Sequence, residues 1–178
     1  MHVAVTAVGV DRPGIVAAVT KVLMDHGGNL EDTAMTRLGG HFAMVLVVEV
    51  PGDEDAAALE AALTAEAGPL GLSVTVRRIA DVSDAADDGG EAWSVSMHGA
   101  DRPGIVHRVT ALLADAGANI VDLSTRRLAT DAGTGYVVFA EVTLPPTTEP
   151  ADLQRQLEAL AAELGVDVHL SPDEADLL

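Results

Sequence analysis

The hexapeptide Asp-Arg-Pro-Gly-Ile-Val occurs twice in this chain, at Asp11 to Val16 and again at Asp101 to Val106. The same spacing of 90 residues relates further identical residues downstream of each copy. These pairs are Thr20 and Thr110, Asp25 and Asp115, Gly27 and Gly117, Asn29 and Asn119, Asp32 and Asp122, and Arg37-Leu38 and Arg127-Leu128. A register kept over this length indicates one structural unit present twice. A chain of 178 residues is long enough for two small domains, each with its own core.

Small shifts in the spacing place the boundaries of the two units. The spacing grows to 92 at Glu49 and Glu141, and to 94 at Gly71 and Gly165, as two short loop insertions would produce. We predict a first domain over residues 1–80, a linker over 81–91, a second domain over 92–170 and a tail over 171–178. The linker stretch contains five acidic residues and two glycines, which is typical of an exposed flexible connection.

Hydrophobic periodicity predicts the same six elements in each unit. The predicted strands and hairpins are Val3 to Val8, then Asn29 to Leu38 and Phe42 to Val50 joined by Gly39-Gly40, then Ser73 to Ile79; in the second unit they are Trp93 to Met97, Asn119 to Leu128, Tyr136 to Leu144 and Val166 to Leu170. The first helix of each unit is expected to begin at Pro13 or Pro103 and to end at Gly27 or Gly117. Its apolar stripe is Ile15, Val16, Val19, Val22 and Leu23, repeated as Ile105, Val109, Leu112 and Leu113. A second helix carries Leu59 and Leu63, or Leu153, Leu157, Leu160 and Leu164, on one face.

The predicted order is therefore strand, helix, strand, strand, helix, strand, twice. This order favours an α+β fold of two ferredoxin-like domains, each a four-stranded antiparallel sheet with both helices on one face. The run Val45 to Val48 has no polar alternation, so apolar side chains are expected on both faces of the sheet. We expect the second face to be covered by the partner domain or by another chain.

Charge and residue types exclude several classes of function. The chain has 28 acidic residues against 10 Lys plus Arg, a formal charge of −18, which disfavours direct contact with nucleic acid or an anionic membrane. The absence of cysteine excludes disulfides and thiolate chemistry. The six histidines show no metal-binding spacing, and the serines lack a nucleophile motif, so we expect no metal, no cofactor and no enzyme activity. We found no signal peptide or membrane span, and we expect a soluble cytoplasmic protein.

The repeated loop has the residue types needed to hold an amino acid. A strand that turns sharply into a helix presents free N–H groups at a positive helix end, which attract a carboxylate. Gly14 and Gly104 have no side chain to obstruct a ligand, and Asp11 or Asp101 could accept hydrogen bonds from an ammonium group. The alternative is purely structural, with the aspartate as a helix cap and the glycine as a turn. A phosphate loop is disfavoured because Ile-Val follows the glycine where Lys and Ser or Thr are needed.

Two other kinds of residue lie near this loop or after its helix. Asn29 and Asn119 begin the next strand, where an amide could contact both charged groups of an amino acid or could simply shape a turn. His98 and His107 flank only the second loop, where the first has Val8 and Ala17. The two loops are therefore not equivalent, and we expect two sites of different affinity or one active site and one silent site.

The pattern Gly-x-Asp-Arg-Pro-Gly-Ile-Val, followed by Gly-x-Asn-(Leu/Ile), resembles the ACT domain, a regulatory amino-acid-binding module. Two such domains with no other domain resemble in particular the glycine cleavage system transcriptional repressor group, through Asn29-Leu30-Glu31-Asp32 and Leu38-Gly39 to Phe42. Members that sense amino acids hold the ligand at a domain interface, between this loop of one domain and the next strand start of its neighbour. A serine-sensing relative has a histidine where this chain has Gly9 and Gly99, so the resemblance does not extend to serine specificity. In formyltetrahydrofolate deformylase a catalytic domain follows the module, whereas here we expect the second module to end near Leu170.

The resemblance implies a non-catalytic regulator that binds a small amino acid, with glycine as one candidate, and signals to a partner protein. The implied ligand-binding residues are Asp11, Arg12, Pro13, Gly14, Ile15, Asn29 and Leu30, and Asp101, Arg102, Pro103, Gly104, Ile105, Asn119 and Ile120. The implied partners are a second copy of the chain in a homo-oligomer and a DNA-binding regulator protein, without direct contact to DNA. The alternative from another class is a structural module that oligomerises through its apolar sheet faces and binds no ligand.

Overall fold

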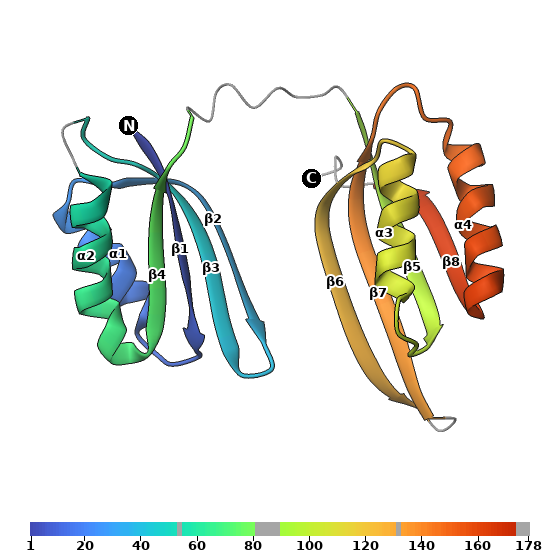
Figure 1. Cartoon of the computed structure of the whole chain (residues 1–178), viewed down its shortest axis with the longest axis horizontal. Coiled ribbons are helices and arrows are strands. Elements are labelled where there is room, and N and C mark those ends of the chain that lie inside the picture. The colour runs from blue at the N-terminus through green and yellow to red at the C-terminus, as the bar shows by residue number, and fades with distance from the viewer. Residues whose placement is uncertain (53–54, 81–89, 131–132, 174–178) are drawn as a thin grey trace. The chain divides into compact units, whose positions relative to one another are not determined.

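The computed structural model describes residues 1–52, 55–80, 90–130 and 133–173, and these form two compact units (Figure 1). The first unit contains β1 (His2–Val10), α1 (Ile15–Asp25), β2 (Asn29–Leu38), β3 (His41–Glu49), α2 (Ala56–Ala67), a short 3-10 helix (Gly68–Leu70) and β4 (Leu72–Arg78). The second contains β5 (Glu91–Ala100), α3 (Ile105–Asp115), β6 (Asn119–Thr130), β7 (Gly133–Leu144), α4 (Pro150–Leu164) and β8 (Val166–Pro172). The predicted α+β class and the repeated element order are confirmed. Of the predicted linker, residues 81–89 lie outside the described residues, and so do residues 174–178 of the predicted tail.

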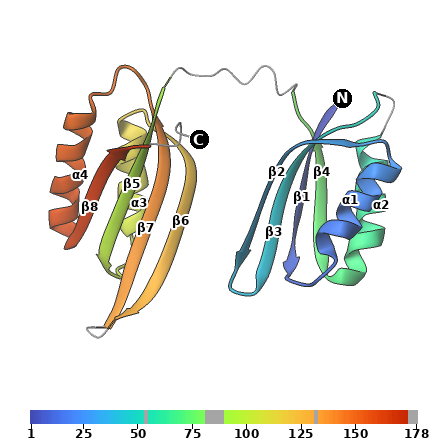
Figure 2. The same ribbon diagram turned by 180° about the vertical axis from the view of Figure 1, so that it is seen from behind.

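Each unit has one antiparallel sheet with both helices packed on the same face (Figures 1 and 2). The strand order is β2-β3-β1-β4 in the first unit and β6-β7-β5-β8 in the second. Because β1 and β2 both pair antiparallel with β3, they run in the same direction, and their carboxyl ends lie at the same end of the sheet. This split arrangement is the predicted ferredoxin-like one, and it brings the hairpin tip close to the loop after β1.

Alternation along the strands places the core between sheet and helices. In β3, Met44, Leu46 and Val48 are buried, whereas Val45 between them is 47% exposed. The predicted helix stripes enter this core, except that Val16 is 43% exposed and therefore does not belong to it. The core of the first unit includes Val3, Val5, Ile15, Val19, Leu23, Leu59 and Leu63; that of the second includes Val95, Met97, Ile105, Val109, Leu113, Leu153 and Leu157.

Two glycines form the turn between β2 and β3. Gly39 and Gly40 have φ angles of 57° and 82°. A two-residue turn with both φ angles positive matches the twist of the flanking strands, and glycine adopts it without steric cost. The predicted Gly39-Gly40 turn is confirmed.

Several strands are longer than their apolar patterns predict. β8 continues through Ser171 and Pro172, which pair with Ser94 and Trp93 of β5. The Ser94 and Ser171 hydroxyl oxygens are 2.9 Å apart, so this extension is supported by polar contacts that a search for apolar alternation does not detect. Glu91, predicted at the end of the linker, likewise begins β5 and pairs with Leu144.

The sheet face away from the helices differs between the units. In the first unit it exposes Val8 and Val45. In the second unit the corresponding region is more polar, with Ser96 and His98 on β5 and Glu141 beside the exposed Phe139 on β7. The apolar second face inferred from Val45 to Val48 is therefore chiefly a property of the first unit. Among the described residues, no helix has the length and apolar composition needed to cross a membrane.

Candidate functional site

The loop from Asp11 to Gly14 connects β1 to α1, and its conformation is set by its last residue. Gly14 precedes the helix with a φ angle of 92°, and Gly104 repeats this at 91°. Left-handed backbone of this kind strongly favours glycine. The helices therefore begin at Ile15 and Ile105, and the prediction that Pro13 and Pro103 are the first helical residues is wrong, because the glycine between them and the helix is not helical.

Within the described part of the chain, no side chain caps either helix start. The first helical hydrogen bond is donated by the Ala18 N–H to the Gly14 carbonyl at 2.9 Å, and by the Arg108 N–H to the Gly104 carbonyl at 3.0 Å. The N–H groups of the three preceding residues therefore have no carbonyl partner within the helix. A Cβ atom on Gly14 or Gly104 would meet no atom within 4 Å, so the space beside each helix start is open.

The predicted site residues Ile15 and Ile105 contribute differently from the others. Each side chain is only 2% exposed and belongs to its unit's core. Only the backbone N–H of these residues can face a ligand. Arg12, Pro13 and Gly14 are exposed, as are their counterparts in the second loop.

Asp11 and Asp101 each form an ion pair with an arginine that the sequence analysis did not assign to the site. The Arg37 Nε lies 2.9 Å from the Asp11 Oδ2, and the Arg127 Nη2 lies 2.9 Å from the Asp101 Oδ2. The Asp11 N–H also donates to the Gly40 carbonyl at 3.0 Å, which links the loop to the hairpin tip. The interpretation of Asp11 as a helix cap is thereby not supported. The signal that could have identified these arginines is the repeat itself, since Arg37 and Arg127 recur at the same spacing as the two aspartates.

Arg102 is engaged elsewhere. Its Nη1 donates to the Leu164 carbonyl at 3.1 Å, near the carboxyl end of α4, and Gly165 packs beside the guanidinium group. A cation at a helix carboxyl terminus satisfies a carbonyl that the helix leaves unpaired. Arg102 therefore fastens the second loop to α4.

Asn29 and Asn119 lie at the opposite end of the sheet from the loops. Asn29 pairs with Glu49, which pairs with His2 at the start of β1, whereas the loop follows Val10 at its end. Eight residues of strand at about 3.3 Å each separate the two ends by about 26 Å. A small ligand at a loop cannot also contact the asparagine of the same unit. Leu30 and Ile120 lie beside the asparagines, Leu30 exposed and Ile120 partly buried.

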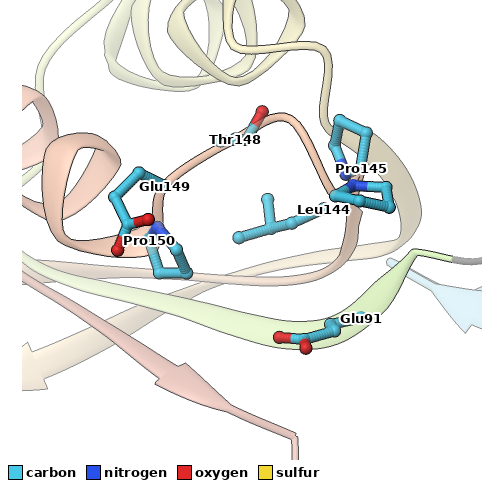
Figure 3. Close-up of a pocket in the computed structure, with 7 residues that line it drawn as sticks. Glu91, Leu144, Pro145, Thr148, Glu149 and Pro150 are labelled. Atoms are coloured by element: carbon cyan, nitrogen blue, oxygen red, sulfur yellow. The ribbon is translucent and has the colours of Figure 1, made fainter.

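A cavity occurs at this far end in each unit. Asn29 lines one of about 290 Å³ together with Met1, Glu49 and Pro51. The corresponding cavity of the second unit, about 260 Å³, is bordered by the carboxylates of Glu91 and Glu149 and by three prolines (Figure 3). Neither cavity includes a residue of the Asp11 or Asp101 loops.

The two histidines that flank the second loop, His98 and His107, take no part in the loop contacts described above. The His98 Nε2 is 3.4 Å from the Asp167 Oδ2, and His107 is exposed on α3. Among the described residues, no group of three or more His, Asp or Glu side chains is arranged to hold a metal ion.

Gly9 lies just before the first loop, where the chain at the start of β4 comes too close to leave room for a side chain. A Cβ atom there would lie 2.3 Å from the Gly71 carbonyl oxygen and 2.9 Å from the Leu72 Cδ2. We expect Gly9→Ala to lower the free energy of unfolding by about 1–3 kcal/mol, because the backbone at Gly71, just before β4, must move. Denaturant unfolding followed by circular dichroism would measure this.

The matched control is Gly52→Ala, where a Cβ atom would meet nothing within 4 Å and the backbone does not need glycine. Equal effects of the two substitutions would contradict the close-approach argument. The same geometry explains why no histidine can stand at this position, since Gly99 is similarly crowded by Val166.

Comparison with known proteins gives matches along almost the whole chain. The sequence profile of the ACT domain matches residues 1–77 and again residues 94–171. The glycine cleavage system transcriptional repressor of Escherichia coli K12 is 27% identical over 166 residues, which are 92% of this chain and 85% of that protein. The crystal structure of an unknown protein from Galdieria sulphuraria is similar with a TM-score of 0.80 and 32% identity, covering 96% of this chain and 97% of that one. The crystal structure of a candidate glycine cleavage system transcriptional repressor has the same fold, with a TM-score of 0.68 and 19% identity over 96% of this chain and 95% of that one.

Proposed function

Because the chain belongs to the ACT domain family, we propose that it is a cytoplasmic, non-catalytic regulator that binds a small amino acid and signals this to a partner protein. The ligand binds at the loops Asp11 to Gly14 and Asp101 to Gly104. Glycine is the first ligand to test, in view of the name of the related Escherichia coli protein.

One observation carries this proposal: in each unit an aspartate stands four residues before a helix start that no described side chain caps. The free N–H groups and the helix dipole attract a carboxylate. The aspartate, 29% exposed in each unit, accepts hydrogen bonds from an ammonium group. A small amino acid is the ligand that carries both charged groups within a few ångströms of each other.

The partner in this proposal is a protein, including a second copy of the chain, and not DNA. The net charge of −18 opposes association with a phosphate backbone. A regulator of transcription with this charge acts through a DNA-binding protein.

A thermal-shift screen of the purified chain against the twenty amino acids tests the proposal. A ligand that binds only the folded chain raises the melting temperature as its concentration increases beyond Kd. We expect such a rise with one or a few small amino acids, and titration calorimetry on these should give saturable binding. A flat response to all twenty would refute amino-acid sensing.

The second candidate function is a ligand-free oligomerisation module. Its support is the exposed apolar side chains on the sheet face of the first unit that the helices leave open, among them Val8, Val10 and Val45, which are 46–49% exposed. Sedimentation with and without amino acids separates the two functions, because only the sensing protein responds to the ligand.

A further inference from the structure

We propose that Arg37 and Arg127 bind the carboxylate of the ligand, so that each site is an aspartate and arginine pair matched to the two charges of an amino acid. This inference rests on the proposed function and adds to it two residues. It also states which chemical group each member of the pair recognises.

The pairing brings together two segments that are distant in the sequence. Arg37 lies near the carboxyl end of β2, opposite Phe42, which is buried on the helix side of the sheet. Its guanidinium group therefore stands on the same side as α1 and at the end where that helix begins. Arg127 has the same place in the second unit, opposite Tyr136.

Both members of each pair keep unused hydrogen-bonding capacity. In each unit, one guanidinium nitrogen contacts one carboxylate oxygen. An arginine has five N–H donors and a carboxylate has about four acceptor positions, so most of each group stays available. The side chains of Arg37 and Arg127 are 70% and 73% exposed, so a ligand can reach them.

Stability alone does not account for the recurrence of the pair. Exposed ion pairs contribute little to folding. The two units also use different nitrogens, Nε in Arg37 and Nη2 in Arg127. The feature present in both units is therefore a positive and a negative group side by side, and not one fixed hydrogen bond.

Arg102, the arginine within the second loop, is directed toward the carboxyl end of α4, where its Nη1 donates to the Leu164 carbonyl. The guanidinium group of Arg127 binds a carboxylate with two parallel hydrogen bonds, as arginine does elsewhere. The free N–H groups at the helix start then add to the same anion. A ligand that lacks its carboxylate loses both contributions.

The test compares amino acids with their amides, which keep the ammonium group and lack the carboxylate. Calorimetry would be run on the full chain with glycine, alanine and serine, each beside its amide. We expect the wild type to bind the preferred amino acid at least about tenfold more tightly than its amide. In the double variant Arg37→Met and Arg127→Met, amino-acid binding should weaken about tenfold to a hundredfold while amide binding changes little, so the preference for the amino acid should shrink by the same factor.

Arg126→Met is the matched control, because Arg126 is the adjacent exposed residue of β6 and lies on the other face of the sheet. It removes one positive charge from the second unit, as Arg127→Met alone does, and should leave the preference unchanged. Melting temperatures of all variants establish that they are folded. Equal weakening of amino acid and amide would mean that the arginines only position the loop, which overturns this inference while the proposed function stands. Absence of amino-acid binding by the wild type would overturn both.

Discussion

Replacing Leu63 by alanine should lower the free energy of unfolding by about 2–5 kcal/mol, the largest stability effect that we expect from a single substitution. The reason is the composition of α2, which is rich in alanine. The residues that it buries are Leu59, Leu63 and Ala67, so two leucine side chains supply most of its packing against the sheet. Leu63 is fully buried, and its removal leaves a cavity in the core of the first unit. Small domains have a total stability of about 5–15 kcal/mol, so this loss is a large fraction of it.

The measurement is denaturant unfolding followed by far-ultraviolet circular dichroism. The single tryptophan, Trp93, belongs to the second unit, so its fluorescence would not report directly on the substituted one. Leu38→Ala is the matched control, because the side chain of Leu38 is 68% exposed. We expect that control to change the stability by less than about 0.5 kcal/mol. A loss below about 1 kcal/mol for Leu63→Ala would mean that α2 does not close the core as described.

Local sequence signals predicted the features of the fold that depend on a few neighbouring residues. The Gly39-Gly40 turn is one of these, because few other residues adopt two consecutive positive φ angles. The helix start shows where such signals are insufficient. Proline is common at the first helical position, yet Gly14 follows Pro13 and takes a left-handed conformation that a sequence pattern does not reveal.

The candidate site was predicted less completely than the fold, for two physical reasons. The partner of Asp11 is 26 positions away at Arg37, and it is determined by sheet register, in which Arg37 lies opposite Phe42 and Phe42 opposite Gly9. Charge alone could not select this arginine over Arg12, which is adjacent in sequence. The position of Asn29 could have been anticipated. Strands on either side of a helix in a split βαβ unit run the same way, so the start of the second lies far from the end of the first.

The largest effect on binding is expected when both loop aspartates are replaced. In the double variant Asp11→Ala and Asp101→Ala, the ammonium group of the ligand loses its negative partner in both units. Hydrogen bonds to charged groups contribute about 1.5–3 kcal/mol each, so affinity should fall about tenfold to a hundredfold. Each single variant should weaken only one site. Where the wild type binds two equivalents per chain in calorimetry, each single variant should bind one with unchanged affinity.

The repeat supplies its own control for this experiment. Asp25 and Asp115 are also related by the spacing of 90 residues, are exposed, and lie at the other end of α1 and α3 from the loops. The double variant Asp25→Ala and Asp115→Ala therefore removes the same charge and should bind as the wild type does. If one aspartate variant abolished all binding and the other had no effect, the chain would have one active loop and one silent loop. Arg102, held by α4 in the second unit, would then be the first difference between the loops to examine. If both aspartates could be removed without loss of binding, the ligand would have to bind elsewhere, and the cavities beside Asn29 and Glu149 would be the next places to test.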